Sequence, residues 1–161
     1  MSIQSQKKNM HTIFNLASQD LGYIYGERES GPNGAKKQFH TTSAAFLRAL
    51  GNDLGLKEFK VNKNYSGIAV SGEITLMGMW GEGNGLYFQI SQPMRPFNSF
   101  LYRSMSHMKD YTGGPNQWMG YELFASGDYD AVLDMLLVLR KAVEKVPDYY
   151  IELKVVDRYV A

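Results

Sequence analysis

The sequence predicts an α+β domain in which a mainly antiparallel sheet packs against helices. Apolar and polar residues alternate through residues 57–91, which is typical of a β-meander. Apolar residues recur at helical spacing near residues 42–54 and 128–145. The 161 residues, 44% hydrophobic and 20% charged, suffice for one globular domain with a sizeable core. Helices packed on one face of such a sheet define the α+β class.

Residues 1–40 are expected to form a loosely organised N-terminal segment, followed by a single α+β domain over residues 41–161. A short helix is predicted at residues 13–17, where apolar side chains cluster. The stretch GERESGPNGAKK (26–37) combines glycine, proline, asparagine and charged residues. This composition predicts an exposed loop.

The first helix of the domain is predicted near residues 42–54. Phe46, Leu50 and Leu54 recur every four residues, which places one apolar stripe toward the core. Gly55 stands where the helix is expected to end, because glycine adopts the left-handed conformation that often follows a last helical turn.

Strand spacing begins at Phe59 and Val61, which share one face, and continues through residues 68–76. A glycine-rich stretch at 81–85 then leads into another strand. Phosphate-binding glycine loops lead into a helix, so a hairpin turn is predicted instead, with Asn84-Gly85 supplying positive φ values.

In the strand LYFQI (86–90), Phe88 is predicted on the apolar face and Tyr87 on the opposite one. Residues 97–108 have apolar offsets of 0, 3, 4, 8 and 11, which favour a helix reaching about Lys109, while a strand over 100–107 is the alternative. Arg103 and His107 share a face under either period, because they lie four residues apart.

The last predicted helix begins at a cap, either Ser126 or Asp128, and carries apolar residues at offsets of 0, 4, 7 and 11 from Val132. It is expected to end before Pro147. The alternating stretch YYIELKVVDRYV (149–160) predicts a final strand.

Several classes of site have no support in the sequence. The chain contains no cysteine, which excludes disulfides, thiolate nucleophiles and zinc-thiolate sites. Its three histidines are scattered, no GxSxG or Walker motif is present, and we expect neither a metal nor a cofactor. The longest apolar run is far shorter than the ~20 residues that a membrane helix needs, so a cytoplasmic protein without membrane contact is expected.

The net charge of +1 is unevenly distributed. Residues 1–63 hold nine Lys or Arg against five acids, whereas the rest of the chain holds eight against eleven. This basic third offers electrostatic attraction to phosphate or to an acidic partner, and a weak nucleic-acid contact is possible. The candidate electrostatic residues are Lys36, Lys37, Lys57, Lys60 and Lys63.

The segment HMKDYTGGPNQW (107–118) is the densest collection of functional side chains. Its glycines, proline and asparagine favour a packed connecting loop, and Gly114-Pro115 suggests a short helix bearing Trp118. A partner contact and an active site are the other interpretations. Six of the nine methionines lie between residues 77 and 119, and methionine and aromatic residues are enriched at recognition surfaces.

A compact chain without cysteine, with eleven tyrosines and no enzyme signature, resembles the small accessory proteins of phages and mobile elements, including inhibitors of bacterial defence nucleases. The resemblance lies in overall composition and not in a residue-level motif. It therefore carries over no functional position.

We expect a binding module without catalytic activity that occludes or modulates a protein or a protein–nucleic-acid assembly. Its candidate contacts are Tyr87, Arg103, His107, Lys109, Tyr111 and Trp118. The alternative is a metal-independent nuclease or phosphotransfer enzyme, in which histidine acts as acid or base and a cation stabilises phosphoryl charge. That alternative would use His40, Arg103, His107 and Tyr111. The sequence does not determine the oligomeric state.

Overall fold

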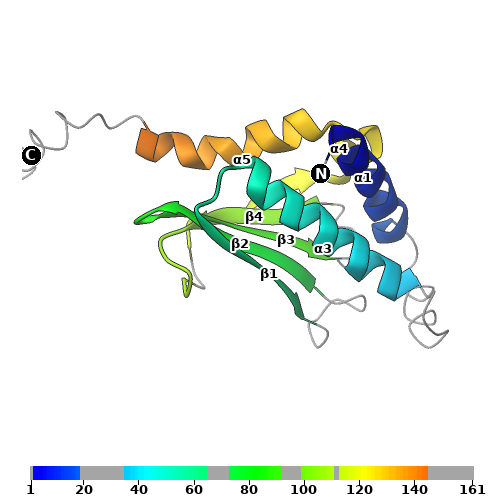
Figure 1. The fold of residues 1–161 in the computed structure, drawn as a ribbon, viewed down its shortest axis with the longest axis horizontal. Helices are drawn as coiled ribbons and strands as arrows, with labels where there is room; N and C mark the ends of the chain where they lie inside the picture. Colours follow the sequence, from blue (N-terminus) through cyan, green and yellow to red (C-terminus); the bar gives the residue numbers. More distant parts are fainter. Residues whose placement is uncertain (1, 19–34, 65–72, 92–98, 111–112, 145–161) are drawn as a thin grey trace, which may run out of the picture.

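A computed structural model describes residues 2–18, 35–64, 73–91, 99–110 and 113–144. Helices and strands follow one another along these residues as Figure 1 shows. They are α1 (Ile3–Ala17), α3 (Ala35–Asp53), β1 (Glu58–Asn64), β2 (Glu73–Gly81), β3 (Asn84–Ser91), β4 (Ser99–Met105), β5 (Gln117–Gly120), α4 (Tyr121–Ser126) and α5 (Tyr129–Glu144). Much of the predicted loop at 26–37, part of the predicted strand at 68–76 and the predicted strand at 149–160 lie outside the described residues.

The five strands form one antiparallel sheet in the order β1-β2-β3-β4-β5. Each strand pairs with the next strand in sequence, which is the topology of a meander. The predicted α+β class is therefore confirmed, and the sheet continues beyond residue 91 through β4 and β5.

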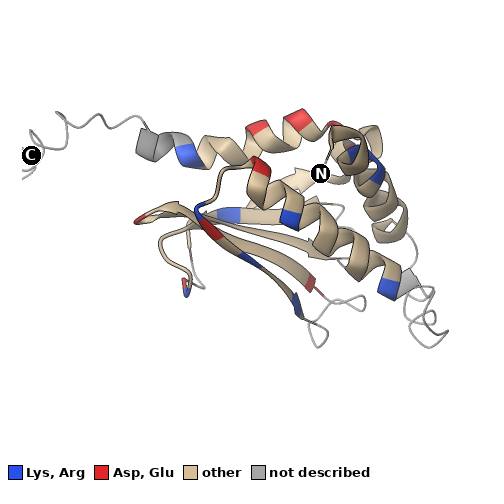
Figure 2. Ribbon diagram, viewed as in Figure 1, with Lys and Arg blue, Asp and Glu red and all other residues tan. Residues whose placement is uncertain are grey.

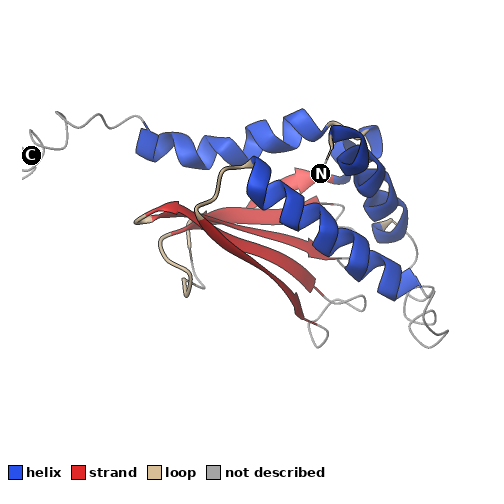
Figure 3. Ribbon diagram, viewed as in Figure 1, coloured by secondary structure: helices blue, strands red, loops and turns tan. Residues whose placement is uncertain are grey.

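The helices gather on one side of the sheet, as Figure 3 shows. α3 packs on β1 and β2, α5 packs on β3, and α1 packs against α3, α4 and α5. Phe46, Leu50 and Leu54, the predicted stripe, are all fully buried in the core. Phe88 and Phe100 reach the same core from the sheet, with their rings 6.5 Å apart.

The short helix predicted at residues 13–17 is the last part of a longer helix, α1, which runs over Ile3–Ala17. Gln6, Met10, Ile13 and Ala17 are buried, at offsets of 0, 4, 7 and 11. Because the first residue of this buried stripe, Gln6, is polar, the helical period of apolar residues is harder to recognise in the sequence. Gln6 satisfies its buried amide by donating from Nε2 to the Phe46 carbonyl at 3.1 Å.

The two predicted core helices are present, and their ends follow ordinary capping chemistry. α3 begins earlier than predicted, at Ala35, and Gly55 follows it with φ +73°. α5 runs over Tyr129–Glu144, and Asp128 accepts a hydrogen bond from the Ala131 N–H at 3.1 Å. The Asp128 carboxylate caps the helix, and its negative charge also interacts favourably with the positive N-terminal end of the helix dipole.

Two local predictions were wrong in detail. The hairpin between β2 and β3 turns at Glu82 and Gly83, and the positive φ belongs to Gly83 (+74°), while Asn84 and Gly85 already lie in β3. The helix suggested at Gly114-Pro115 is absent, since Trp118 lies in strand β5. In the hairpin, some two-residue turns require a positive φ only at the second of their two central residues, which here is Gly83.

Residues 99–105 form strand β4, so the helix favoured for this stretch was wrong and the strand alternative was right, although the strand ends at Met105. Both faces of β4 are covered. Phe100 and Tyr102 point to the main core, whereas Met105 joins a second cluster on the other face of the sheet.

We call this second cluster the methionine cluster. It contains Met77, Met79 and Met105, each at most 6% exposed, with Tyr87 and Met108 packed against it. Met108 belongs to the loop after β4, so this loop folds back onto the sheet face opposite the helices.

Candidate partner-binding surface

The loop after β4, which the structure describes over residues 106–110 and 113–116 and which we call the Asp110 loop, is organised by the Asp110 carboxylate. Its Oδ2 accepts from the Ser106 N–H at 2.9 Å and from the Ser106 hydroxyl at 2.8 Å, and its Oδ1 accepts from the Gly113 N–H at 2.7 Å. The Asp110 N–H donates in turn to the His107 carbonyl at 3.0 Å. The Asp110 carboxylate thus accepts hydrogen bonds from N–H and O–H groups that have no backbone acceptor within the described part of the loop.

Glycine lets the end of this loop lie directly on β4. The Gly114 N–H donates to the Ser104 carbonyl at 3.1 Å. Gly113 has φ +53°, and a Cβ there would meet both the Ser104 carbonyl oxygen and the Arg103 side chain. Only glycine combines this conformation with so close an approach.

His107 and Lys109 occupy the exposed outer part of the loop. The Lys109 N–H donates to His107 Nδ1 at 3.2 Å, which orients the ring and leaves Nε2 available for a contact. Because hydrogen bonds to Asp110 fix the backbone of the loop, the side chains of His107 and Lys109 extend into solvent from an ordered backbone.

Arg103 is placed differently from the other candidate contacts. It lies on the loop side of the sheet, as His107 does, but it is only 9% exposed. Its guanidinium carbon lies 4.1 Å from the centre of the Tyr87 ring, a cation–π contact. Burial raises the pKa of Tyr87, while the nearby Arg103 lowers it and Glu73 raises it. Tyr87 and Arg103 therefore support the loop from beneath.

Trp118 stands out as an exposed aromatic side chain among the described residues. It is 53% exposed although it lies in a regular strand, where it pairs with Leu101 of β4. The next residue, Met119, is fully buried on the helix side, so alternation points Trp118 to the loop side. Residues 115–118 are exposed without interruption.

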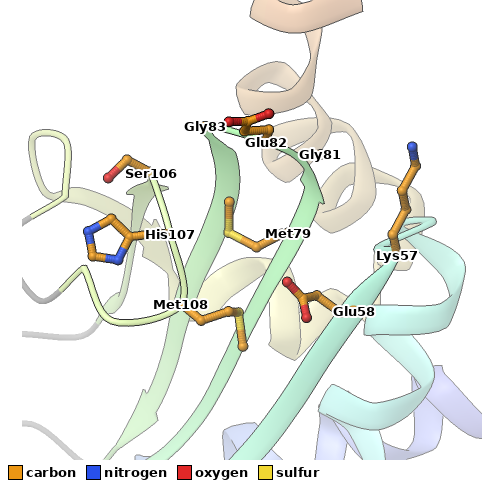
Figure 4. Close-up of a pocket in the computed structure, with 9 residues that line it drawn as sticks. All are labelled: Lys57, Glu58, Met79, Gly81, Glu82, Gly83, Ser106, His107 and Met108. Carbon is orange, nitrogen blue, oxygen red and sulfur yellow. The ribbon is translucent and has the colours of Figure 1, made fainter.

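Two hollows flank the loop at Ser106 and His107. The first, of about 370 Å³, has Met79 and Met108 as its floor and is drawn in Figure 4. The second, of about 750 Å³, lies between the loop and the end of α5, where Val138 is 57% exposed. Gly83 lines both hollows, so the β2–β3 turn and the Asp110 loop form their shared wall.

Comparison with protein-family models, with curated proteins and with solved structures finds no match. Within the described ranges, no group of three histidine, aspartate or glutamate side chains is placed to bind a metal. No described helix has both the length and the apolar character that crossing a membrane requires. Geometry alone must indicate what the surface does.

The candidate electrostatic residues do not form one patch. Lys57, Lys60 and Lys63 are exposed along the β1 edge, but Figure 2 shows them interspersed with acidic positions of β1 and β2. Lys37 is exposed on α3, at the other end of the molecule from the Asp110 loop, and Lys36 lies in the same helix. A broad basic face is not formed by these residues.

Of the described residues of the enzymatic alternative, His40 does not lie near Arg103 and His107. His40 is 3% exposed and lies in α3 near its first turns, on the helix side of the sheet. The start of α3 and the Asp110 loop lie at opposite ends of the view in Figure 1. Tyr111 lies outside the described residues, so its predicted role as a contact stays a prediction.

Sequence reasoning missed the residues that build the surface. Asp110 is not among the predicted contact residues, yet it organises the loop. An aspartate followed three residues later by Gly113-Gly114 is the signal that was available, because aspartate side chains cap turns of this length. Met79 and Met108 had no positional signal, since they meet only through tertiary folding.

Proposed function

We propose that this chain is a binding module whose contact surface comprises the exposed part of the Asp110 loop and Trp118. It acts by occluding or modulating a protein or a protein–nucleic-acid assembly, without bond-breaking of its own. A bacterial defence nuclease is the class of target that the compositional resemblance favours. The observation that carries the proposal is an indole that is 53% exposed on a paired strand, on the same sheet face over which a loop held by the Asp110 carboxylate folds.

Tryptophan is among the side chains that contribute most to binding energy at protein interfaces. Exposing one on a regular strand leaves a large apolar area in water, which a partner can cover. The strand already fixes the backbone of Trp118, so binding orders little besides the side chain.

The Asp110 loop supplies polar groups around this anchor. The loop after β4 folds over the sheet face opposite the helices, and Trp118 of the neighbouring strand β5 points to that same face. Hydrogen-bond donors on a preorganised loop add specificity, because they need partners of fixed position. This arrangement suits recognition of a folded surface.

Paired variants test the proposal. The tagged wild-type chain, Trp118→Ala and Ile3→Ala are compared in quantitative capture from a host extract. Ile3 is 57% exposed, but it belongs to α1 on the helix side, which makes Ile3→Ala a matched control. We expect Trp118→Ala to lose at least tenfold in captured partner and Ile3→Ala to retain it. Equal capture by both variants would refute the proposed surface.

A further inference from the structure

The hollow of about 370 Å³ beside the Asp110 loop has an unusual combination of an apolar floor and free carboxylates. Met79 of β2 is 6% exposed and forms its floor together with half-buried Met108. Glu58 at the start of β1 and Glu82 in the β2–β3 turn stand at its rim, and both are exposed. Neither carboxylate has a hydrogen-bond or ion-pair partner among the described residues.

The side chains around the hollow are not turned the same way. In Figure 4 the Met79 and Met108 side chains and the Glu58 carboxylate point toward its centre. Lys57, the one lysine of the lining, extends away from the methionines. Two carboxylates against one distant ammonium leave the hollow locally anionic.

We propose that this hollow receives a basic side chain, arginine in preference to lysine, from the protein that the module binds. The alkyl stem would pack on the two thioethers while the cationic head meets the Glu58 carboxylate, and Glu82 at the rim adds to the negative charge. Long basic side chains bury their stems on apolar surface in this manner. The inference rests on the proposed function, because it specifies the chemistry of the partner.

Arginine fits better than lysine for two physical reasons. Its guanidinium is less strongly hydrated than an ammonium, so it loses less on approaching the thioether sulfurs. Its planar fork also donates two parallel hydrogen bonds to a single carboxylate, here that of Glu58. An apolar side chain in the hollow would displace water from the carboxylates and would offer no hydrogen-bond donor or positive charge in return.

Methyl NMR of the full chain tests the proposal directly. The nine methionine methyls are labelled with ¹³C, assigned by single Met→Leu variants, and titrated with the acetylated amides of arginine, lysine and leucine. We expect arginine amide to shift the Met79 and Met108 methyls more than lysine amide does, and leucine amide to shift them little. The methyls of Met10 and Met119, fully buried in the main core, serve as internal references.

Glutamine variants supply the control. Glu58→Gln and Glu82→Gln should each weaken arginine amide binding by about two- to fivefold, the range of exposed ion pairs. Glu73→Gln, six residues from Met79 along β2, should leave binding unchanged. Equal shifts with leucine amide, or unchanged binding in both rim variants, would overturn the proposal. This outcome is separate from the Trp118 test, which does not involve the hollow.

Discussion

Replacing Asp110 with alanine removes the acceptor that links Ser106 to Gly113 across the loop after β4. Three donors lose their partner, namely the Ser106 N–H, the Ser106 hydroxyl and the Gly113 N–H. Hydrogen bonds to charged groups contribute ~1.5–3 kcal/mol each when water cannot replace them. Ser106 is exposed, so water takes over most of its two bonds, whereas Gly113 is half-buried. Closure of the loop should therefore lose about 2 kcal/mol, equivalent to roughly a 30-fold rise in its open population.

Amide hydrogen exchange measures this loss where it occurs. Protection of the Gly113 and Gly114 amides should fall by about 30-fold in Asp110→Ala, while amides in the centre of β2 and β3 stay protected. Asp110→Asn keeps a neutral acceptor of nearly the same size, so its amide protection should lie between that of the wild type and that of Asp110→Ala. The reasoning would be refuted if Asp110→Ala exchanged at Gly113 like the wild type, or if the whole sheet lost protection equally.

Other predictions concern the core and the absence of catalysis. Gly78→Ala places a Cβ 2.7 Å from both Leu56 and Phe59 and should cost ~1–3 kcal/mol in a urea melt, whereas Gly81→Ala, with nothing within 4 Å, should be nearly neutral. Burial and a 2.6 Å hydrogen bond to Asp53 raise the pKa of Tyr129 above its ordinary value of about 10, so the folded state holds this proton more tightly than the unfolded state. Stability should then decline as the pH rises above about 10, and Tyr129→Phe should lessen the decline in thermal melts. Labelled RNA and DNA incubated with the chain in EDTA at pH values from about 5 to 8 should remain intact. Cleavage that disappears in His107→Ala would instead establish the enzymatic alternative.

The sequence predicts elements with one apolar face much better than elements with two. The α3 stripe and the cap of α5 follow from local spacing and from single side chains, so they were found. In β4 the helices cover one face and the Asp110 loop covers the other. Apolar side chains therefore occur on both faces of the strand, which mimics helical offsets. The loop that packs on the second face of β4 has no hydrophobic periodicity from which its position could be predicted.

The candidate surface shows the same limit. Trp118 and His107 could be selected from their residue type, because aromatic and histidine side chains commonly mediate contacts. The burial of Arg103 against Tyr87 could not, since it depends on the register Tyr87↔Arg103 between β3 and β4. The hollow of Met79, Met108 and Glu58 likewise joins three segments that are distant in sequence. Such sites become visible only once strand pairing is known.

Hydrogen-exchange footprinting of the chain with its captured partner tests the central claim most directly. We predict that partner binding protects residues 106–110 and 115–118 and leaves α1 unchanged. Protection confined to the helix side of the sheet, with the loop and Trp118 exchanging as in the free chain, would contradict the account.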